Sequence, residues 1–246
     1  MKILVSDYDR TFEVNEESIE INKLAVKDFM EKGNIFVIAT GRSYIDIKAK
    51  IDKYNILYDY LIINHGATII DENGKIIYNF TIDNNIVFNI KNDLEVSKYN
   101  IKYLNYKPDK AKENVYFCCS KFESRLDFNC EDLTKIAITY NDSVNVSSIN
   151  QKIINKYPTV NSYHISKKSI EIISSKTNKS KAIKLLANYY NLNEDNIYTI
   201  GDGYSDIDMI KDYKGYAMRE SVKELKEVAI DEVNSVSELI KKIMSV

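Results

Sequence analysis

Four short apolar runs set the strongest limit on what this chain of 246 residues can fold into. Each run is only a few residues long and rich in β-branched side chains, which is typical of strands buried on both faces of a parallel sheet. The runs cover residues 3–5, 35–39, 60–63 and 197–200. Neighbouring parallel strands need a crossover connection, so the chain between the runs should contain helices.

Helical patterns do lie between the runs. From about residue 16 to residue 32, apolar residues recur at helical spacing and the pattern stops at Gly33, a residue that suits the position after a helix end. The apolar residues at this spacing are Ile21, Leu24, Ala25 and Met30. Further helices are expected near 43–54, 179–190 and 206–211. This alternation predicts right-handed βαβ units and an α/β fold with a Rossmann-like, doubly wound parallel sheet.

The middle of the chain has a different pattern. A hairpin signal surrounds Gly74, and from about residue 84 to residue 174 short alternating segments replace the buried runs. Strands are expected near 115–118, 135–140, 160–165 and 169–173, and helices near 85–99 and 146–157. We interpret this part as an α+β cap domain at residues 83–174, inserted into a discontinuous core made of residues 1–82 and 175–246.

The composition excludes several classes of protein. The 34 Lys and Arg residues are balanced by 36 Asp and Glu residues, which argues against a nucleic-acid partner held by phosphate neutralisation. No apolar stretch approaches the ~18 residues of a membrane-spanning helix. The three cysteines are odd in number, which suits a reducing compartment, and no signal-peptide pattern precedes Asp7. We therefore expect a cytoplasmic protein without a membrane partner, and the sequence leaves its oligomeric state open.

Acidic residues and glycines follow the apolar runs. Asp7, Asp9 and Thr11 come after the first run, Thr40 and Gly41 after the second, and Gly201, Asp202, Gly203 and Asp206 after the fourth. Ligands of open α/β sheets bind beside the carboxyl ends of the strands, so these residues should gather at one edge. Carboxylates crowded there repel one another unless a hard cation binds. Because Mg²⁺ is usually held by one or two carboxylates and a substrate phosphate, the pattern predicts magnesium and phosphoryl chemistry.

The order of these motifs resembles that of the haloacid dehalogenase superfamily of phosphohydrolases, in particular its Cof-type branch with a large inserted α+β cap. The resemblance covers nearly the whole chain and rests on residues 7–11, 39–42, 64–67, 179–183 and 201–207. It implies a Mg²⁺-dependent phosphatase that acts on phosphomonoesters of small metabolites through an aspartyl-phosphate. Sugar phosphates are the broad expectation for the substrate, with nucleotides and phosphorylated cofactors such as pyridoxal phosphate as alternatives.

The resemblance also implies roles for individual residues. Asp7 would be the nucleophile and a metal ligand, and Asp9 would act as acid and then base while its main-chain carbonyl binds the metal. Asp202 would supply the second metal-binding carboxylate. Thr40, the Gly41 N–H, Lys179 and Ser205 would bind the substrate phosphate, with Lys179 neutralising its charge. Asp206 would orient Lys179 or the waters of the metal.

Two residues depart from the pattern of the branch, which usually has Gly at Arg10 and Asn at Ser205. We expect the Arg10 side chain to point outward, and the alternative is a contact with an anionic substrate. Ser205 donates one hydrogen bond where an amide offers two, so phosphate binding could be weaker. Lys181 is the rival of Lys179 for the catalytic lysine, although the spacing favours Lys179.

Three other functions compete with a phosphatase. A phosphomutase or phosphotransferase would need the same core, and a non-catalytic protein that binds a phosphorylated ligand could have kept it. A receiver-like signalling module also uses an acidic cluster with a Thr and a Lys, but such modules are about half this length and lack an insert. The presence of Asp7, Asp9, Lys179 and Asp202 argues against loss of catalysis.

Overall fold

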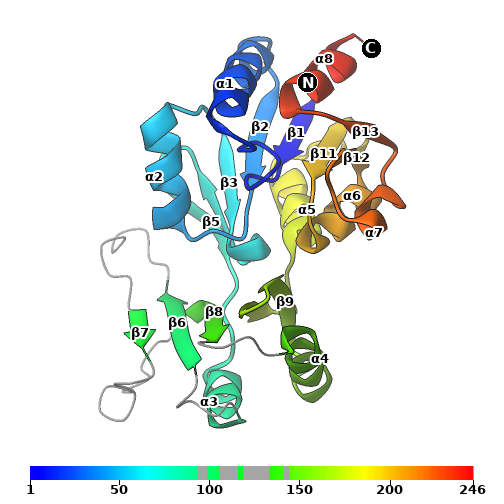
Figure 1. Cartoon of the computed structure of the whole chain (residues 1–246). Helices are drawn as coiled ribbons and strands as arrows, with labels where there is room; N and C mark the ends of the chain where they lie inside the picture. The colour runs from blue at the N-terminus through cyan, green and yellow to red at the C-terminus, as the bar shows by residue number, and fades with distance from the viewer. Residues whose placement is uncertain (94–98, 106–115, 119–132, 141–144, 246) are drawn as a thin grey trace. The chain divides into compact units, whose positions relative to one another are not determined.

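An eight-stranded sheet with the order β13-β12-β11-β1-β2-β3-β4-β5 forms the first of two units in the computed structural model (Figure 1). The structure describes residues 1–93, 99–105, 116–118, 133–140 and 145–245. The first unit comprises Met1–Ile77 and Asn178–Val246, and the second comprises Tyr78–Thr177. These limits differ by a few residues from those expected at 82 and 174.

The four apolar runs are the central strands of the first sheet. They form β1 (Ile3–Ser6), β2 (Ile35–Ala39), β3 (Tyr60–Ile63) and β11 (Ile197–Gly201). All of them pair in parallel, with Ile3 of β1 opposite both Ile35 of β2 and Ile197 of β11. The expected α/β class and the Rossmann-like parallel sheet are therefore confirmed.

The edges of this sheet were less visible in the sequence. β12 (Lys214–Met218) and β13 (Asp231–Val233) continue the parallel side beyond β11. β13 has no apolar run, and that of β12, residues 216–218, contains no β-branched residue, so the pattern that identifies the central strands does not find them. On the other side, β4 (Thr68–Asp71) is antiparallel to β3, and β5 (Ile76–Asn79) lies next to β4.

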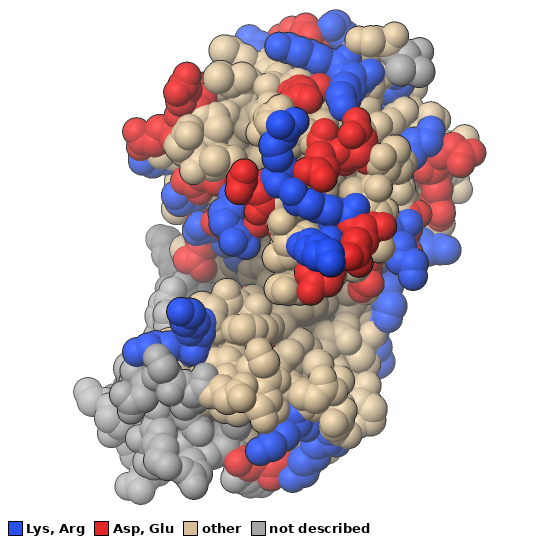
Figure 2. All heavy atoms as spheres, turned by 45° about the vertical axis from the view of Figure 1, so that its right-hand side comes forward, with Lys and Arg blue, Asp and Glu red and all other residues tan. Residues whose placement is uncertain are grey.

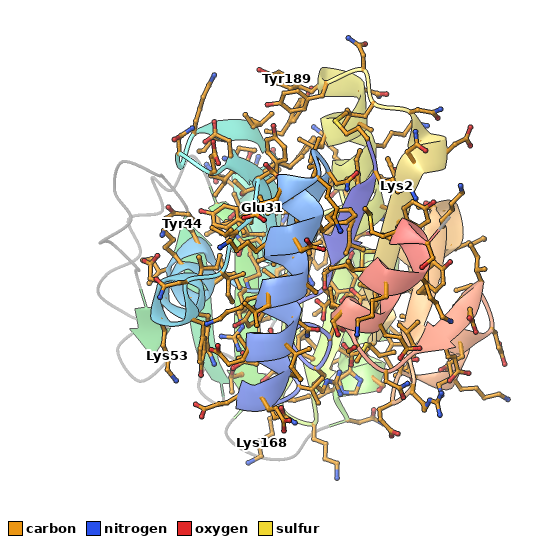
Figure 3. All side chains as sticks on the ribbon, turned by 90° about the horizontal axis from the view of Figure 1, so that it is seen from above. Lys2, Glu31, Tyr44, Lys53, Lys168 and Tyr189 are labelled. Atoms are coloured by element: carbon orange, nitrogen blue, oxygen red, sulfur yellow. The ribbon has the colours of Figure 1, made fainter. Side chains whose placement is uncertain are left out.

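Helices cover both faces of the sheet. Helix α1 (Glu16–Glu31) packs against α8 (Val236–Met244) on one face, and α5 (Lys179–Tyr189) packs against α6 (Ile207–Asp212) on the other (Figures 1 and 3). The remaining helices are α2 (Tyr44–Tyr54) and the short α7 (Lys223–Lys226). Asn15 and Ser18 form a reciprocal cap at the start of α1, and Gly33, at φ 78°, follows its end.

The buried face of α1 differs from the expected apolar positions. Ile21 and Leu24 are exposed, and the buried residues of the helix are Ile19, Asn22, Val26 and Phe29. Asn22 occupies a core position because its side chain donates a hydrogen bond to the Phe12 carbonyl and accepts one from the Ser237 N–H. Because a polar residue takes one of the buried positions, the apolar residues alone do not identify the buried face of this helix.

The second unit contains a five-stranded antiparallel sheet with the order β7-β6-β8-β10-β9. Its strands are β6 (Tyr99–Asn105), β7 (Tyr116–Cys118), β8 (Leu133–Tyr140), β9 (Val160–Ser166) and β10 (Ser169–Ser174). Helices α3 (Asn84–Asp93) and α4 (Val146–Lys156) complete the unit. Apolar residues of α3, α4 and the strands form one buried cluster, which gives this unit its own core.

The helix expected at 85–99 is wrong at its C-terminal end. Helix α3 is described only as far as Asp93, and Tyr99 begins strand β6, which pairs with β8. Ile101 of β6 lies opposite Ile138 of β8, so the alternating apolar residues here belong to a strand. Residues 94–98 lie outside the described part of the chain.

None of the described helices combines the length and the apolar character that crossing a bilayer demands.

Candidate active site

Two neighbouring parallel strands, β1 and β11, bring acidic residues together at their carboxyl ends. The Asp7 N–H donates a hydrogen bond to the Ile200 carbonyl (2.9 Å), which extends the pairing of the two strands by one residue. Asp202 directly follows β11. Asp7, Asp202 and Asp206 are all buried, and one carboxylate oxygen from each lies within 4.8 Å of the other two.

The ammonium group of Lys179 lies within this cluster. Its Nζ is 2.7 Å from Asp7 Oδ1 and 2.6 Å from Asp206 Oδ1, and the side chain is 1% exposed. Lys179 is the first residue of α5, whose N-terminus is capped by the Asn178 side chain. Lys181, the rival for this role, is exposed. The structure thus brings Lys179, and not Lys181, into contact with the acidic residues.

Asp206 holds the loop after β11 in place. Its Oδ2 accepts hydrogen bonds from the N–H groups of Asp202 (3.1 Å) and Gly203 (3.0 Å), while its Oδ1 contacts Lys179. Gly201 allows this close packing, because a Cβ atom there would lie 2.6 Å from Asp206 Cβ. Both oxygens of Asp206 are therefore engaged by the protein itself, which suits a residue that positions the loop and Lys179.

Burial shifts the proton equilibria of the cluster. It raises the pKa of Asp7 well above its usual value, since Lys179 only partly offsets the combined effect of burial, Asp206 and Asp202. Burial and Asp206 likewise raise the pKa of Asp202, against the opposing effect of Arg10. For Lys179, burial alone would lower the pKa, but the charges of Asp206 and Asp7 outweigh it and the pKa is raised.

The cluster could hold a metal ion. Three buried carboxylates face one buried lysine, so the interior of the site has an excess of negative charge. All of these donors are hard oxygens, which are the ligands that Mg²⁺ and Ca²⁺ prefer. Asp206 is bound by the buried Lys179 and by two main-chain N–H groups, whereas one partner of Asp202 is the exposed side chain of Arg10, so Asp7 and Asp202 are the carboxylates better suited to contact the ion directly. The residues present fit a hard divalent cation.

Asp9 is more exposed than Asp7 and pairs with an arginine from the next strand end. Arg42 Nε lies 2.9 Å from Asp9 Oδ2, and Arg42 Nη2 lies 2.6 Å from Asp9 Oδ1, so the guanidinium binds both oxygens. The Asp9 side chain is 48% exposed. No role for Arg42 was predicted, although its position directly after Thr40 and Gly41 was the available signal in the sequence.

Thr40 and Gly41 lie at the end of β2 on a tightly packed turn. Thr40 is buried and its Oγ1 accepts a hydrogen bond from the Arg42 N–H (3.1 Å). A Cβ atom at Gly41 would lie 2.4 Å from the ring of His65, so only glycine fits there without rearrangement. The His65 N–H in turn donates to the Thr40 carbonyl (3.0 Å). His65 thus lies directly against the loop expected to bind phosphate.

The two residues that depart from the family pattern flank the acidic cluster. Ser205 is half-buried in the 3₁₀ turn Tyr204–Asp206. Arg10 has φ 61°, a left-handed conformation that explains why glycine is common at this position. Its side chain is exposed, as expected, but Nη2 ends 2.8 Å from Asp202 Oδ2. Thr11 Oγ1 donates to the other oxygen of Asp202 (3.3 Å), a contact that the sequence analysis did not anticipate.

Comparison with known proteins identifies relatives of this chain. Residues 4–238 match the family model of the haloacid dehalogenase-like hydrolases. An uncharacterised protein of Mycoplasma capricolum is 31% identical, with 85% of this chain and 87% of that protein covered. The 5-amino-6-(5-phospho-D-ribitylamino)uracil phosphatase YwtE of Bacillus subtilis is 26% identical, with 92% and 91% covered. The solved structure of the subclass IIB sugar phosphatase BT4131 superposes with a TM-score of 0.76 at 17% identity, covering 100% of both chains.

The chain therefore belongs to the haloacid dehalogenase-like hydrolase family, as the motifs indicated. Within that family it is an enzyme of the phosphatase type. Its Rossmann-like core carries the acidic cluster, and the second unit is the inserted part of the chain.

Proposed function

We propose that this protein is a Mg²⁺-dependent phosphatase that hydrolyses phosphomonoesters of small metabolites through an aspartyl-phosphate on Asp7. The observation that carries the proposal is the buried cluster in which Asp7 and Asp202 lie together and Lys179 contacts Asp7. Bound Mg²⁺ would be held by Asp7, Asp202 and the Asp9 carbonyl, and it would neutralise charge on the phosphate and the carboxylates.

The first half-reaction transfers the phosphoryl group to the protein. A carboxylate oxygen of Asp7 attacks phosphorus, a new O–P bond forms, and the bond between phosphorus and the alcohol oxygen breaks. Asp9 donates its proton to the departing alcohol oxygen. Lys179 stabilises the negative charge near Asp7, while the Thr40 hydroxyl and the Gly41 N–H donate to the phosphoryl oxygens. Ser205 would add a hydrogen bond to the substrate phosphate.

The second half-reaction restores the enzyme. Asp9, now ionised, takes a proton from a water molecule, whose oxygen attacks phosphorus. The O–P bond to Asp7 breaks, inorganic phosphate leaves, and Asp7 is again a carboxylate. Arg42 binds both oxygens of the ionised Asp9 and so holds this carboxylate in one orientation for the step in which it takes a proton from water. Asp206 keeps Lys179 beside Asp7 in both steps.

The proposed substrates are small phosphorylated polyols or sugars, with phosphorylated cofactors as the alternative. The names of two similar proteins, a ribitylaminouracil phosphatase and a sugar phosphatase, support this class. The charge pattern also favours a small molecule over nucleic acid, because acidic and basic side chains are interspersed on the core surface shown in Figure 2. We place the reaction in the cytoplasm, where such metabolites are made.

A phosphate-release screen tests the proposal. The full chain, treated with EDTA and dialysed, is assayed on sugar phosphates, polyol phosphates, nucleotides and pyridoxal phosphate, with and without added Mg²⁺. We expect Mg²⁺-dependent release from at least one sugar or polyol phosphate and none from the Asp7→Asn variant. Turnover that is unchanged by EDTA, or retained by Asp7→Asn, would contradict the mechanism. Transfer of the phosphoryl group to a sugar in place of water would identify a phosphotransferase.

A further inference from the structure

Arg10 covers the acidic cluster from its solvent side. Its Nη2 lies 2.8 Å from Asp202 Oδ2, and the Arg10 side chain is 76% exposed while that of Asp202 is 6% exposed. The backbone of Arg10 is fixed by a hydrogen bond from its N–H to the Glu13 carbonyl (2.9 Å) and by its left-handed φ. The backbone of Arg10 is thus held in place while its exposed guanidinium contacts the buried carboxylate of Asp202.

The two cations of the cluster are held in different ways. Lys179 is buried and contacts both Asp7 and Asp206, so moving it would leave two buried carboxylates without their partner. Arg10 contacts Asp202 from solvent, so its guanidinium regains water when the pair opens, and this contact is easier to break than the two buried contacts of Lys179. Of the two, Arg10 is therefore the cation that another positive charge can displace.

We propose that Arg10 competes with the divalent cation for Asp202 and so lowers the metal affinity of this protein. This inference rests on the proposed function, in which Asp202 is a metal ligand. A divalent ion held by Asp202 would add positive charge at the carboxylate that Arg10 already contacts, and like charges that share one carboxylate repel each other. Metal binding must therefore either move Arg10 away from Asp202 or occur against the repulsion between the metal ion and the Arg10 guanidinium.

The proposed competition between Arg10 and the divalent cation depends on the arginine side chain and not on the core fold alone. Glycine, which is usual here in the branch, offers no charge to the site, whereas Arg10 supplies a guanidinium that reaches Asp202. The Thr11 hydroxyl, which donates to Asp202 Oδ1, is neutral and does not oppose a cation in the same way. Removing the Arg10 charge while keeping Thr11 should therefore isolate the effect.

Equilibrium metal binding tests this inference without any measurement of turnover. Mg²⁺ is titrated calorimetrically into the metal-free full chain, without substrate, for the parent, Arg10→Gly, Arg10→Asn and Arg10→Lys. Glycine and asparagine both tolerate the left-handed backbone at this position. We expect Arg10→Gly and Arg10→Asn to bind Mg²⁺ about three- to tenfold more tightly, the range set by losing a weak ion pair and a like-charge repulsion. Arg10→Lys should stay near the parent.

Two controls separate the possible results. Lys27→Gln removes an exposed positive charge from α1, and it should leave Mg²⁺ affinity nearly unchanged. Asp202→Asn should weaken Mg²⁺ binding strongly. If Asp202→Asn weakens binding but both neutral Arg10 variants bind as the parent does, or more weakly, the competition is wrong while the metal site stands. If neither the parent nor the neutral Arg10 variants bind Mg²⁺, or if Asp202→Asn binds it as well as the parent does, the metal site of the proposed function is wrong and the inference falls with it.

Discussion

Each unit of this protein contains a buried lysine paired with carboxylates, and the two lysines differ in where they lie. In the core, Lys179 is the first residue of α5 and contacts Asp7 and Asp206 beside the carboxyl ends of β1 and β11. In the second unit, Lys135 lies within β8 and contacts Glu171 of the neighbouring strand β10 at 3.0 Å. Their exposed fractions are similar, 1% and 3%.

The comparison shows that burial of a lysine does not by itself mark a catalytic group. Lys179 lies where several strand ends and a helix start converge, which is where open α/β sheets bind ligands. Lys135 lies within β8, and its ion pair with Glu171 of the paired strand β10 supports the register of the sheet. We therefore assign chemistry to Lys179 and stability to Lys135.

Replacing Lys179 should give the largest effect. Lys179→Ala removes the positive charge beside Asp7, and we expect kcat to fall by about 10²–10⁴-fold, the range for a group that stabilises transition-state charge. Lys181→Ala, two residues further along the same helix, is the matched control and should change kcat less than about twofold. Steady-state kinetics on p-nitrophenyl phosphate with saturating Mg²⁺ measure both. A large loss in Lys181→Ala with an active Lys179→Ala would reverse the assignment.

Arg42 should have an intermediate effect that depends on the substrate. Lysine at this position keeps the charge but cannot bind both oxygens of Asp9, so Arg42→Lys should lower kcat by about 10–100-fold. If Arg42 acts by orienting Asp9, the loss must be larger for an alkyl phosphate than for p-nitrophenyl phosphate, whose leaving group needs little protonation. Equal losses for the two substrates would show that Arg42 does not act through Asp9.

Lys135 should affect stability. Lys135→Ala leaves Glu171 without this partner, and we expect the free energy of unfolding to fall by about 1–3 kcal/mol, less than for a fully buried pair because Glu171 is 19% exposed. The double variant Lys135→Met, Glu171→Leu should recover most of that loss, since apolar residues of similar volume often replace a buried ion pair without cost. Urea unfolding measures both. A double variant no more stable than Lys135→Ala would show that the pair does more than balance charge.

The sequence predicted the central part of the core well because its signals there are local. Each of the four apolar runs is a central strand, and Asp7, Lys179 and Asp202 meet because parallel strands end at the same edge of the sheet. Lys179 was favoured over Lys181 because Ala182 and Ile183 follow it at the spacing of the family motif.

The remaining features depend on contacts that are distant in sequence. Asn22 lies in the core of α1 because of partners at Phe12 and Ser237. The ion pairs of Arg10 with Asp202 and of Arg42 with Asp9 join different strand ends, and no local sequence pattern predicts them. Strand β6 was not predicted, and its first residue, Tyr99, was included in the expected helix, because short apolar segments are evidence for either structure.

Trapping the phosphoryl group on the protein tests the central claim most directly. The Asp9→Ala variant is mixed with p-nitrophenyl phosphate labelled in its phosphoryl group, quenched in acid and digested. Because p-nitrophenolate leaves without a proton while hydrolysis of the intermediate needs the missing base, label should accumulate to at most one equivalent per chain, on the peptide that contains Asp7. The Asp7→Asn, Asp9→Ala double variant should retain no label. Label on any other residue, or turnover by Asp9→Ala equal to that of the parent, would contradict the account.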